Sequence, residues 1–477
     1  MKLKSCIYKL ISIGIFISIA LCFASEFIEN INIMVLTVLI LYLCILLYAG
    51  INFENRLILL MFQIAIVVFL LGSVFFSFFE GKGCGFEEKF PKTICFTVMF
   101  LLFLSQLFLL MGYLFMENRK ISRRNIEKNN SSKHDKYEVI RKKTSAILLL
   151  MCMLPKFLTE MEKVIYVQAK GYLNLYLDFS SSLPYIIIKM SQVYEIFFWL
   201  FLFSNPSKKK TYIVLVSNIF LSALCFGYGK RTPILMSTLM TIIYLIWRNK
   251  KEGTNKWINY KILGLMIMML PVILAGLQMF TYMRMELQST SNSVSEYIRD
   301  FFSDSSITVL CNGIKYENAF PKGNYTFGSL WTCMVRNNSV ICTVFGLKPL
   351  ANQTLEMALY GHTFGQTLTY LVMPWAFFSG GGMGSSYIAE LFYDYSYFGV
   401  VIGNFLLGIL IFKLDNIRPS DSKTIQVIMM LIIENIILLP RDGTFSFIYN
   451  VFTPTNIILL LIFELIVKLL AKKNAKY

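Results

Sequence analysis

The chain has 477 residues, of which 56% are hydrophobic and 15% are charged, and its mean hydropathy is +0.60. This composition excludes an ordinary soluble protein, because it offers too little polar surface to cover several globular domains, and it indicates a protein embedded in a membrane. The formal net charge of +17 is also typical of proteins that bind nucleic acid. That class is excluded too, because the basic residues gather in short segments between apolar runs.

Apolar segments of roughly 20 residues recur along the chain, and each is long enough to cross about 30 Å of hydrocarbon as an α-helix. Only helices can span a membrane at that length. The predicted spans are residues 6–24, 31–49, 57–79, 94–116, 144–160, 184–204, 211–228, 232–247, 262–282, 396–413, 424–440 and 446–468. We therefore expect an all-α polytopic membrane protein with about 12 transmembrane helices, whose first span is retained rather than cleaved as a signal peptide.

Basic side chains predict the orientation of these helices. When the spans are threaded in order, one side of the membrane receives the basic connections and the other receives the acidic turns at Glu26/Glu29 and Glu87-Glu88. The basic connections lie at residues 2–4, 56, 117–143, 208–210, 248–261, 413–423 and 472–473. Because Lys and Arg are enriched in cytoplasmic loops, both termini are expected in the cytoplasm.

The predicted spans divide the chain into three parts. Residues 1–282 hold helices 1 to 9 and a basic cytoplasmic loop at 117–143, and residues 396–477 hold helices 10 to 12 and a cytoplasmic tail. Between them, residues 283–395 form a large external loop between helices 9 and 10, whose aromatic side chains favour an ordered structure. Residues 365–379 are apolar but shorter than a span, which predicts a re-entrant or interfacial element.

The connection between the seventh and eighth predicted spans is a tight external turn at residues 227–233, with the sequence Gly-Tyr-Gly-Lys-Arg-Thr-Pro. Arg231 offers a planar fork to phosphate oxygens, Lys230 offers a point charge, and the glycines let backbone N–H groups approach an anion. These features predict a pyrophosphate-binding site. The alternative is that both side chains simply extend from a helix end toward water.

A glycine-rich segment with carboxylates precedes the tenth predicted span, at residues 380–394. If the part after Ser385 is helical, Glu390 and Asp394 share one face at the i, i+4 spacing. A carboxylate at the low-dielectric boundary has a raised pKa and is a candidate general base. The alternative is a flexible hinge followed by a helix with ordinary surface acids.

The other candidate residues also lie in external segments. Arg441 stands in the short turn Leu439-Pro440-Arg441-Asp442-Gly443, where it either binds an anionic group or forms a local turn with its acidic neighbour. The large loop supplies Arg284, Arg336 and His362. His362 is a candidate proton acceptor, although single histidines are commonly structural.

Charged residues within predicted spans keep a transport function open, because such residues are costly and tend to mark pathways. They include Lys189, Glu195, Glu434 and Glu464. The sequence contains no Walker A loop, HExxH, GxSxG or Asp-x-Asp motif, and its cysteines lack metal-site spacing. We therefore expect no cofactor and no metal ion.

The whole pattern resembles the Wzy-type O-antigen and capsular polysaccharide polymerases. The resemblance is carried by the twelve-span topology with a late external loop, the Gly-Lys-Arg turn, the segment from Gly380 to Asp394 and the Pro440-Arg441 turn. O-antigen ligases are similar in architecture. The resemblance implies a multi-pass protein of the bacterial cytoplasmic (inner) membrane.

The resemblance also implies a glycosyltransferase whose donor is a glycan on a polyprenyl (undecaprenyl) pyrophosphate carrier. The growing glycan would be transferred to a new lipid-linked repeat unit at the external face, with Arg231 and Arg441 binding the anionic donor and Glu390 facing the site. A carboxylate or His362 would deprotonate the acceptor hydroxyl. Expected partners are membrane lipid, a flippase and a chain-length regulator. The alternatives are a flippase for the same lipid-linked unit, or a ligase.

Overall fold

The structure is a computed structural model that describes residues 2–123, 135–172, 174–253, 257–284, 293–303, 307–337, 339–417 and 421–473. The described part of the chain is built from helices joined by short connections and contains no strand, which confirms the all-α prediction. Residues 124–134 of the predicted basic loop lie outside the described residues.

The first third of the chain forms a group of long antiparallel helices. They are α1 (Lys2–Ile28), α2 (Ile31–Ile51), α3 (Leu57–Ile66), the π-helical turn η1 (Val67–Leu71), α4 (Gly72–Phe79) and α5 (Lys92–Arg123). The apolar runs form helices because no water is available to the backbone in a membrane, so its polar groups must bond within the segment. Asn30 caps α2 by accepting from the backbone N–H groups of Asn32 and Ile33.

The central helices enclose the polar cavities described below. They are α6 (Asp135–Lys170), α7 (Asn174–Leu177), α8 (Tyr185–Gln192), α9 (Tyr194–Phe203), α10 (Lys208–Ala223), η2 (Leu224–Tyr228), α11 (Thr232–Glu252) and α12 (Tyr260–Arg284). Helix α6 extends ten residues beyond the predicted end of its span at residue 160, to Lys170. Helices α8 and α9 form a pair bent by 41°.

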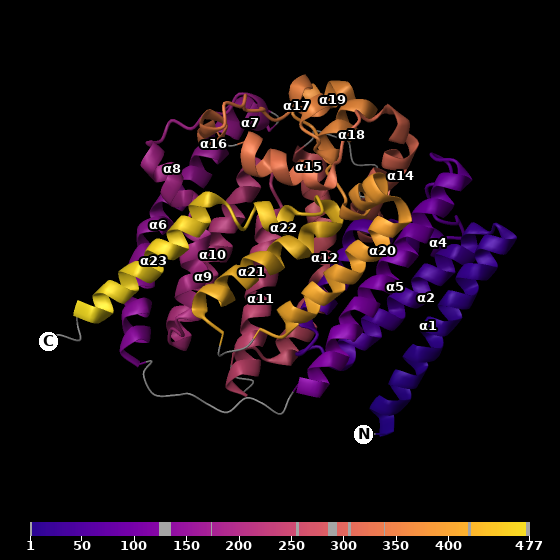
Figure 1. Ribbon diagram of the computed structural model, residues 1–477, viewed down its shortest axis with the longest axis horizontal. Coiled ribbons are helices and arrows are strands. Elements are labelled where there is room, and N and C mark those ends of the chain that lie inside the picture. The colour runs from indigo at the N-terminus through magenta and orange to yellow at the C-terminus, as the bar shows by residue number, and fades with distance from the viewer. Residues whose placement is uncertain are drawn as a thin grey trace.

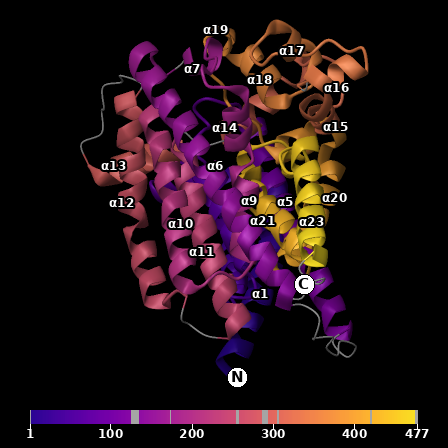
Figure 2. The ribbon, with the colours of Figure 1, turned by 90° about the vertical axis from the view of Figure 1, so that its left-hand side faces the viewer.

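The predicted large loop folds into short helices. They are α13 (Val294–Ser303), α14 (Ile307–Lys315), η3 (Glu317–Ala319), α15 (Thr326–Trp331), η4 (Thr332–Arg336), α16 (Ser339–Val344), α17 (Leu355–Tyr360), α18 (Phe364–Val372) and α19 (Pro374–Phe378). Helices α15 to α19 gather at one end of the molecule, which we call the loop end, and both chain ends lie toward the opposite end (Figures 1 and 2). The segment predicted to be re-entrant corresponds to α18 and α19, and its depth in the membrane stays a prediction.

The C-terminal part consists of α20 (Tyr387–Asp415), α21 (Lys423–Leu438), η5 (Leu439–Arg441), α22 (Ser446–Tyr449) and α23 (Pro454–Lys473). Helix α20 is kinked at Ser396, whose φ is 55°. Its longer half packs closely on α5, since a methyl group at Gly408 would lie 2.1 Å from the Leu109 carbonyl oxygen. Small residues at such crossings allow the backbones of membrane helices to approach.

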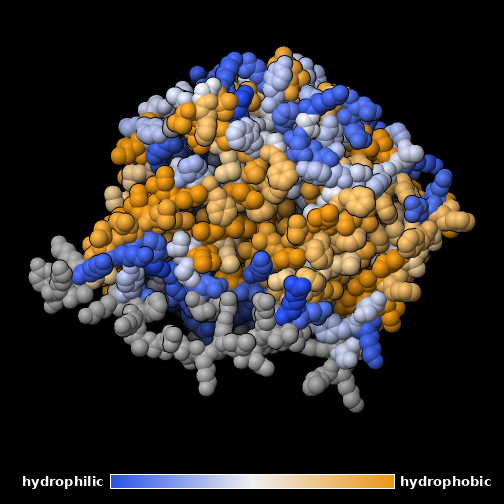
Figure 3. All heavy atoms as spheres, in the orientation of Figure 1, coloured by the Kyte–Doolittle hydropathy of each residue, from blue (hydrophilic) through white to orange (hydrophobic). Residues whose placement is uncertain are grey.

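Nine of the described helices are long and apolar enough to cross a membrane, and the bent α8–α9 pair would make ten. An apolar band runs across the middle of the surface, with polar residues gathered above and below it (Figure 3). Every predicted span overlaps a helix, which confirms a polytopic membrane protein. The number twelve itself stays a prediction, because α11 and α12 are not among these helices.

Candidate functional site

Residues 438–450, which we call the turn segment, connect α21 to α23 near the loop end. The segment is held by Glu390 of α20, whose side chain is buried. The Glu390 carboxylate accepts hydrogen bonds from the Thr444 backbone N–H at 2.7 Å and from the Ser385 hydroxyl at 2.9 Å. A methyl group at Gly443 would lie only 2.9 Å from Glu390 Oε1, so glycine permits this close approach.

The turn segment brings Arg441 to the glycine-rich segment, two features that the sequence places far apart. A methyl group at Gly384 would lie 3.6 Å from the Arg441 carbonyl oxygen and 3.9 Å from its Nε. Arg441 is exposed, and the space beside Gly382 is open. Arg441 therefore lies next to Gly384, two residues along the chain from the open space at Gly382.

Two acidic groups of this region differ in their surroundings from ordinary surface acids. Burial raises the pKa of the Asp442 carboxyl group. Burial and the neighbouring Asp442 carboxylate raise the pKa of the Tyr449 hydroxyl. Asp442 and Tyr449 are thus paired on the inner side of the turn segment, while Arg441 lies on its exposed side.

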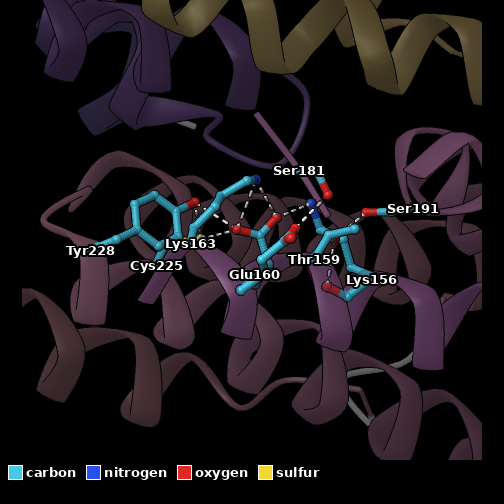
Figure 4. Close-up of polar contacts among 9 residues, drawn as sticks. Lys156, Thr159, Glu160, Lys163, Ser181, Ser191, Cys225 and Tyr228 are labelled. Carbon is cyan, nitrogen blue, oxygen red and sulfur yellow. Dashed lines mark hydrogen bonds and ion pairs between the residues drawn. The ribbon is translucent and has the colours of Figure 1, made fainter. Parts of the chain in front are cut away.

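A cavity of about 360 Å³, which we call the lysine cavity, opens between α6, α8, α9, α10, α11 and α21. Glu160 of α6 is its central buried acid (Figure 4). The Glu160 carboxylate pairs with Lys156 at 2.8 Å and with Lys163 at 3.2 Å, and it accepts a hydrogen bond from the Tyr228 hydroxyl at 2.7 Å. Each charge at the centre of this cavity is therefore partnered.

A second cavity of about 500 Å³, which we call the asparagine cavity, lies between α8, α9, α21, η4 and the turn segment. Its wall includes Tyr449, Asn435 and Asn450. Glu195 of α9 and Glu434 of α21 line this cavity and also line the lysine cavity. The two cavities consequently adjoin at a pair of carboxyl groups.

An apolar groove of about 490 Å³ runs along α20 on the other side of the turn segment. Its wall is formed by Leu391, Phe398, Ile402, Leu406, Leu439, Thr444, Phe445 and Phe447, among others. Phe398 is 80% exposed at the molecular surface. The turn segment therefore separates an apolar groove from a polar cavity.

Two of the predicted catalytic residues lie together in the loop rather than at a cavity. The Asp394 carboxylate accepts from the backbone N–H groups of Tyr325, at 3.0 Å, and Thr326, at 2.6 Å, where α15 begins. The His362 ring lies 5.7 Å from the Tyr325 ring and edge-on to it, and a methyl group at Gly323 would lie 2.3 Å from His362 Nδ1. Both side chains support the fold of residues 323–328.

The two basic residues of the predicted Gly-Lys-Arg turn point in different directions. Lys230 Nζ lies 5.3 Å from the centre of the Tyr176 ring and 6.0 Å from that of Tyr228. Arg231 instead donates to the Leu277 carbonyl oxygen of α12 at 3.3 Å. Lys230 therefore packs near α7 and η2, whereas Arg231 contacts α12.

The remaining predicted arginines belong to the loop. Arg336 ends η4, and its carbonyl oxygen accepts from the Leu350 N–H at 3.1 Å. Arg284 ends α12, and its side chain lies outside the described part of the structure. Arg336 does not line any of the cavities described above.

Sequence reasoning missed the polar face of α6. Lys156, Glu160 and Lys163 recur at spacings of four and three, which place them on one face of a helix. The predicted span ended at residue 160, so this pattern was divided between a span and a connection. Within the described residues, no group of three or more His, Cys, Asp or Glu side chains could hold a metal ion.

The helical bundle and its polar cavities define a multi-pass membrane protein that can receive a polar ligand beside an apolar one. The family model for O-antigen polysaccharide polymerase Wzy matches residues 8–474, so the chain belongs to this family. This match confirms the resemblance and places the protein among the polymerases of the bacterial inner membrane that act on lipid-linked oligosaccharide. No curated protein and no solved structure matches the chain.

Proposed function

We propose that the chain polymerises polyprenyl-pyrophosphate-linked repeat units by transferring the growing glycan onto a new unit at the loop end, with that end at the external face of the inner membrane and both termini in the cytoplasm. The observation that carries this proposal is the turn segment, which has an apolar groove on one side and a polar cavity on the other. A lipid-linked sugar has the same division, with an apolar chain joined to a polar glycan. The turn segment would lie where the lipid chain of the substrate joins its glycan.

The apolar groove supplies a place for the lipid chain of the substrate. It follows α20 from Thr444 at the turn segment to Leu410, and it is lined almost wholly by apolar side chains. The helix from Phe398 to Leu410 extends for roughly 18 Å at 1.5 Å per residue. A chain in this groove would keep its headgroup beside Arg441.

Arg441 and the glycine-rich segment supply a place for the pyrophosphate. Guanidinium binds phosphate oxygens through two parallel hydrogen bonds, and the open space at Gly382 leaves room for the anion. As the glycosidic bond to the carrier breaks, negative charge grows on the leaving pyrophosphate. A fixed cation there stabilises the transition state more than the ground state.

The other predicted residues take supporting roles in this proposal. Glu390 positions the turn segment, because its oxygens already accept from Thr444 and Ser385. Asp394 and His362 hold the loop, and Lys230 packs near Tyr176 and Tyr228. A flippase would deliver the repeat unit, and a chain-length regulator would end polymerisation.

Replacing Arg441 tests the proposal in a strain that lacks the native gene. We expect Arg441→Ala to leave mostly single repeat units on the cell surface, and Arg441→Lys to restore polymer only in part, because Lys lacks the planar fork. Glycan size would be measured by gel electrophoresis, with Arg299→Ala as the control because Arg299 forms an ion pair with Glu80 on the surface. Full-length polymer in Arg441→Ala would contradict the proposed role.

The deletion strain itself separates the competing functions. Loss of a polymerase leaves single repeat units at the surface, whereas loss of a flippase leaves none. Loss of a ligase leaves polymer that is not attached to its final acceptor. Only the first result agrees with the proposal.

A further inference from the structure

Glu195 and Glu434 form a carboxyl pair at the junction of two cavities. Glu195 is in the first turn of α9, directly after the bend between α8 and α9, and Glu434 lies on α21. Both side chains line the lysine cavity and the asparagine cavity, so the two carboxyl groups lie close to each other. The pair is thus accessible from both cavities.

Each of the two cavities is large enough to hold a ligand. Their volumes of about 360 and 500 Å³ lie within the range of about 300–1,000 Å³ that is usual for ligand pockets. The asparagine cavity extends to the turn segment, where the proposed function places the donor headgroup. The lysine cavity is left for the acceptor, and the two substrates would meet at Glu195 and Glu434.

The chemistry of a carboxyl pair suits proton acceptance. Two carboxylates side by side repel each other, and a proton held between two such groups removes the repulsion. A carboxylate can take a proton from a hydroxyl group.

The lysines of α6 near the pair form ion pairs with Glu160 and not with Glu195 or Glu434. From α6, Lys156 and Lys163 face the lysine cavity, but both are held by Glu160. The other titratable groups that line the two cavities are Glu162 of α6, Tyr194 of α9, Cys333 of η4 and Tyr449 of α22. Lys189 of α8 donates at 3.1 Å to Gln192, which lines both cavities. Among the described residues, no ion pair includes Glu195 or Glu434.

We infer that the Glu195–Glu434 pair is the general base of glycan transfer, an inference that rests on the proposed polymerase function. The acceptor hydroxyl oxygen attacks the anomeric carbon of the donor and forms the new glycosidic bond. The bond from that carbon to the carrier breaks, and its electron pair leaves with the polyprenyl pyrophosphate. The hydroxyl proton passes to the carboxylate of the pair and from there to water in the cavities.

The test uses the full-length protein in the deletion strain. We expect the double variant Glu195→Gln/Glu434→Gln to lower the rate of polymerisation on the order of 100- to 10,000-fold, because it removes the base and keeps side-chain size and hydrogen bonding. Each single variant should lose less, since one carboxyl group remains. The control is Glu356→Gln, because Glu356 forms a surface ion pair with Lys348 away from both cavities.

Glycan length and infrared spectra of the protein both test the inference. If the deletion strain makes no polymer but the double variant makes glycan of wild-type length, the pair is not the general base and the polymerase function still stands. If the deletion strain itself still makes polymer, the polymerase function is contradicted. Infrared spectra of the purified protein should also show a protonated-carboxyl band that Glu434→Gln removes. If the double variant does not accumulate in the membrane, absence of that band in the wild-type protein overturns the inference.

Discussion

Gly443→Ala tests how closely Glu390 and the turn segment fit together. The added methyl group would lie 2.9 Å from Glu390 Oε1 and 3.4 Å from Oε2, so the carboxylate must move away from the turn. That movement lengthens its 2.7 Å hydrogen bond from the Thr444 N–H. Because a buried hydrogen-bonding group without its partner costs about 1–3 kcal/mol, we expect a loss of about 5- to 150-fold in polymerisation rate.

The assay is the glycan length distribution in the deletion strain, with protein level measured in the same membranes. Gly50→Ala is the matched control, because Gly50 is in α2 and a methyl group there meets no atom within 4 Å. Alanine in a helix is also more favourable than glycine. Wild-type glycan length in Gly443→Ala, at normal protein level, would refute the role of Glu390 in positioning the turn segment.

Three further predictions address the loop, the turn segment and the groove. Asp394→Asn should make the segment near Tyr325 more sensitive to limited proteolysis, because two backbone N–H groups lose their charged acceptor; unchanged cleavage would contradict this. Burial raises the pKa of Asp442 above its unfolded value, so the stability it contributes is fully present below the unfolded pKa and is lost as pH rises through the folded pKa. Asp442→Asn should therefore raise the melting temperature at neutral pH more than at acidic pH, and an equal change at both would be inconsistent with this account. Leu406→Trp, which narrows the groove, should shorten the glycan, whereas Ile17→Trp on the exposed face of α1 should not.

The membrane architecture was predictable because it depends on the local property of apolar length. Segments such as Ile31–Ile51 and Leu57–Phe79 satisfy that requirement on their own, so the helices fall where the sequence indicates them. Boundaries that depend on side-chain partners were less predictable. Helix α6 continues to Lys170, and Lys156 and Lys163 both pair with Glu160 along it, contacts that hydropathy does not contain.

The site was predictable only in part, because it depends on contacts between segments that are far apart in the sequence. Glu390 and Arg441 were selected from their local segments, and the structure places both segments together at Gly384 and Gly443. Lys230 and Arg231 were expected to act jointly, but neighbours in a turn at a helix start point to different sides. The pairing of Glu195 with Glu434 depends on how α9 and α21 pack, which no local pattern in the sequence shows.

The arrangement of lipid and glycan around the turn segment is the central claim, and photocrosslinking tests it most directly. A photoreactive amino acid would replace Phe398 in the apolar groove, and Ile17 on α1 in the control, in cells that make the repeat unit. Mass spectrometry of the adducts should identify the polyprenyl-pyrophosphate-linked glycan at position 398 and ordinary phospholipid at position 17. Capture of phospholipid alone at both positions would contradict the account.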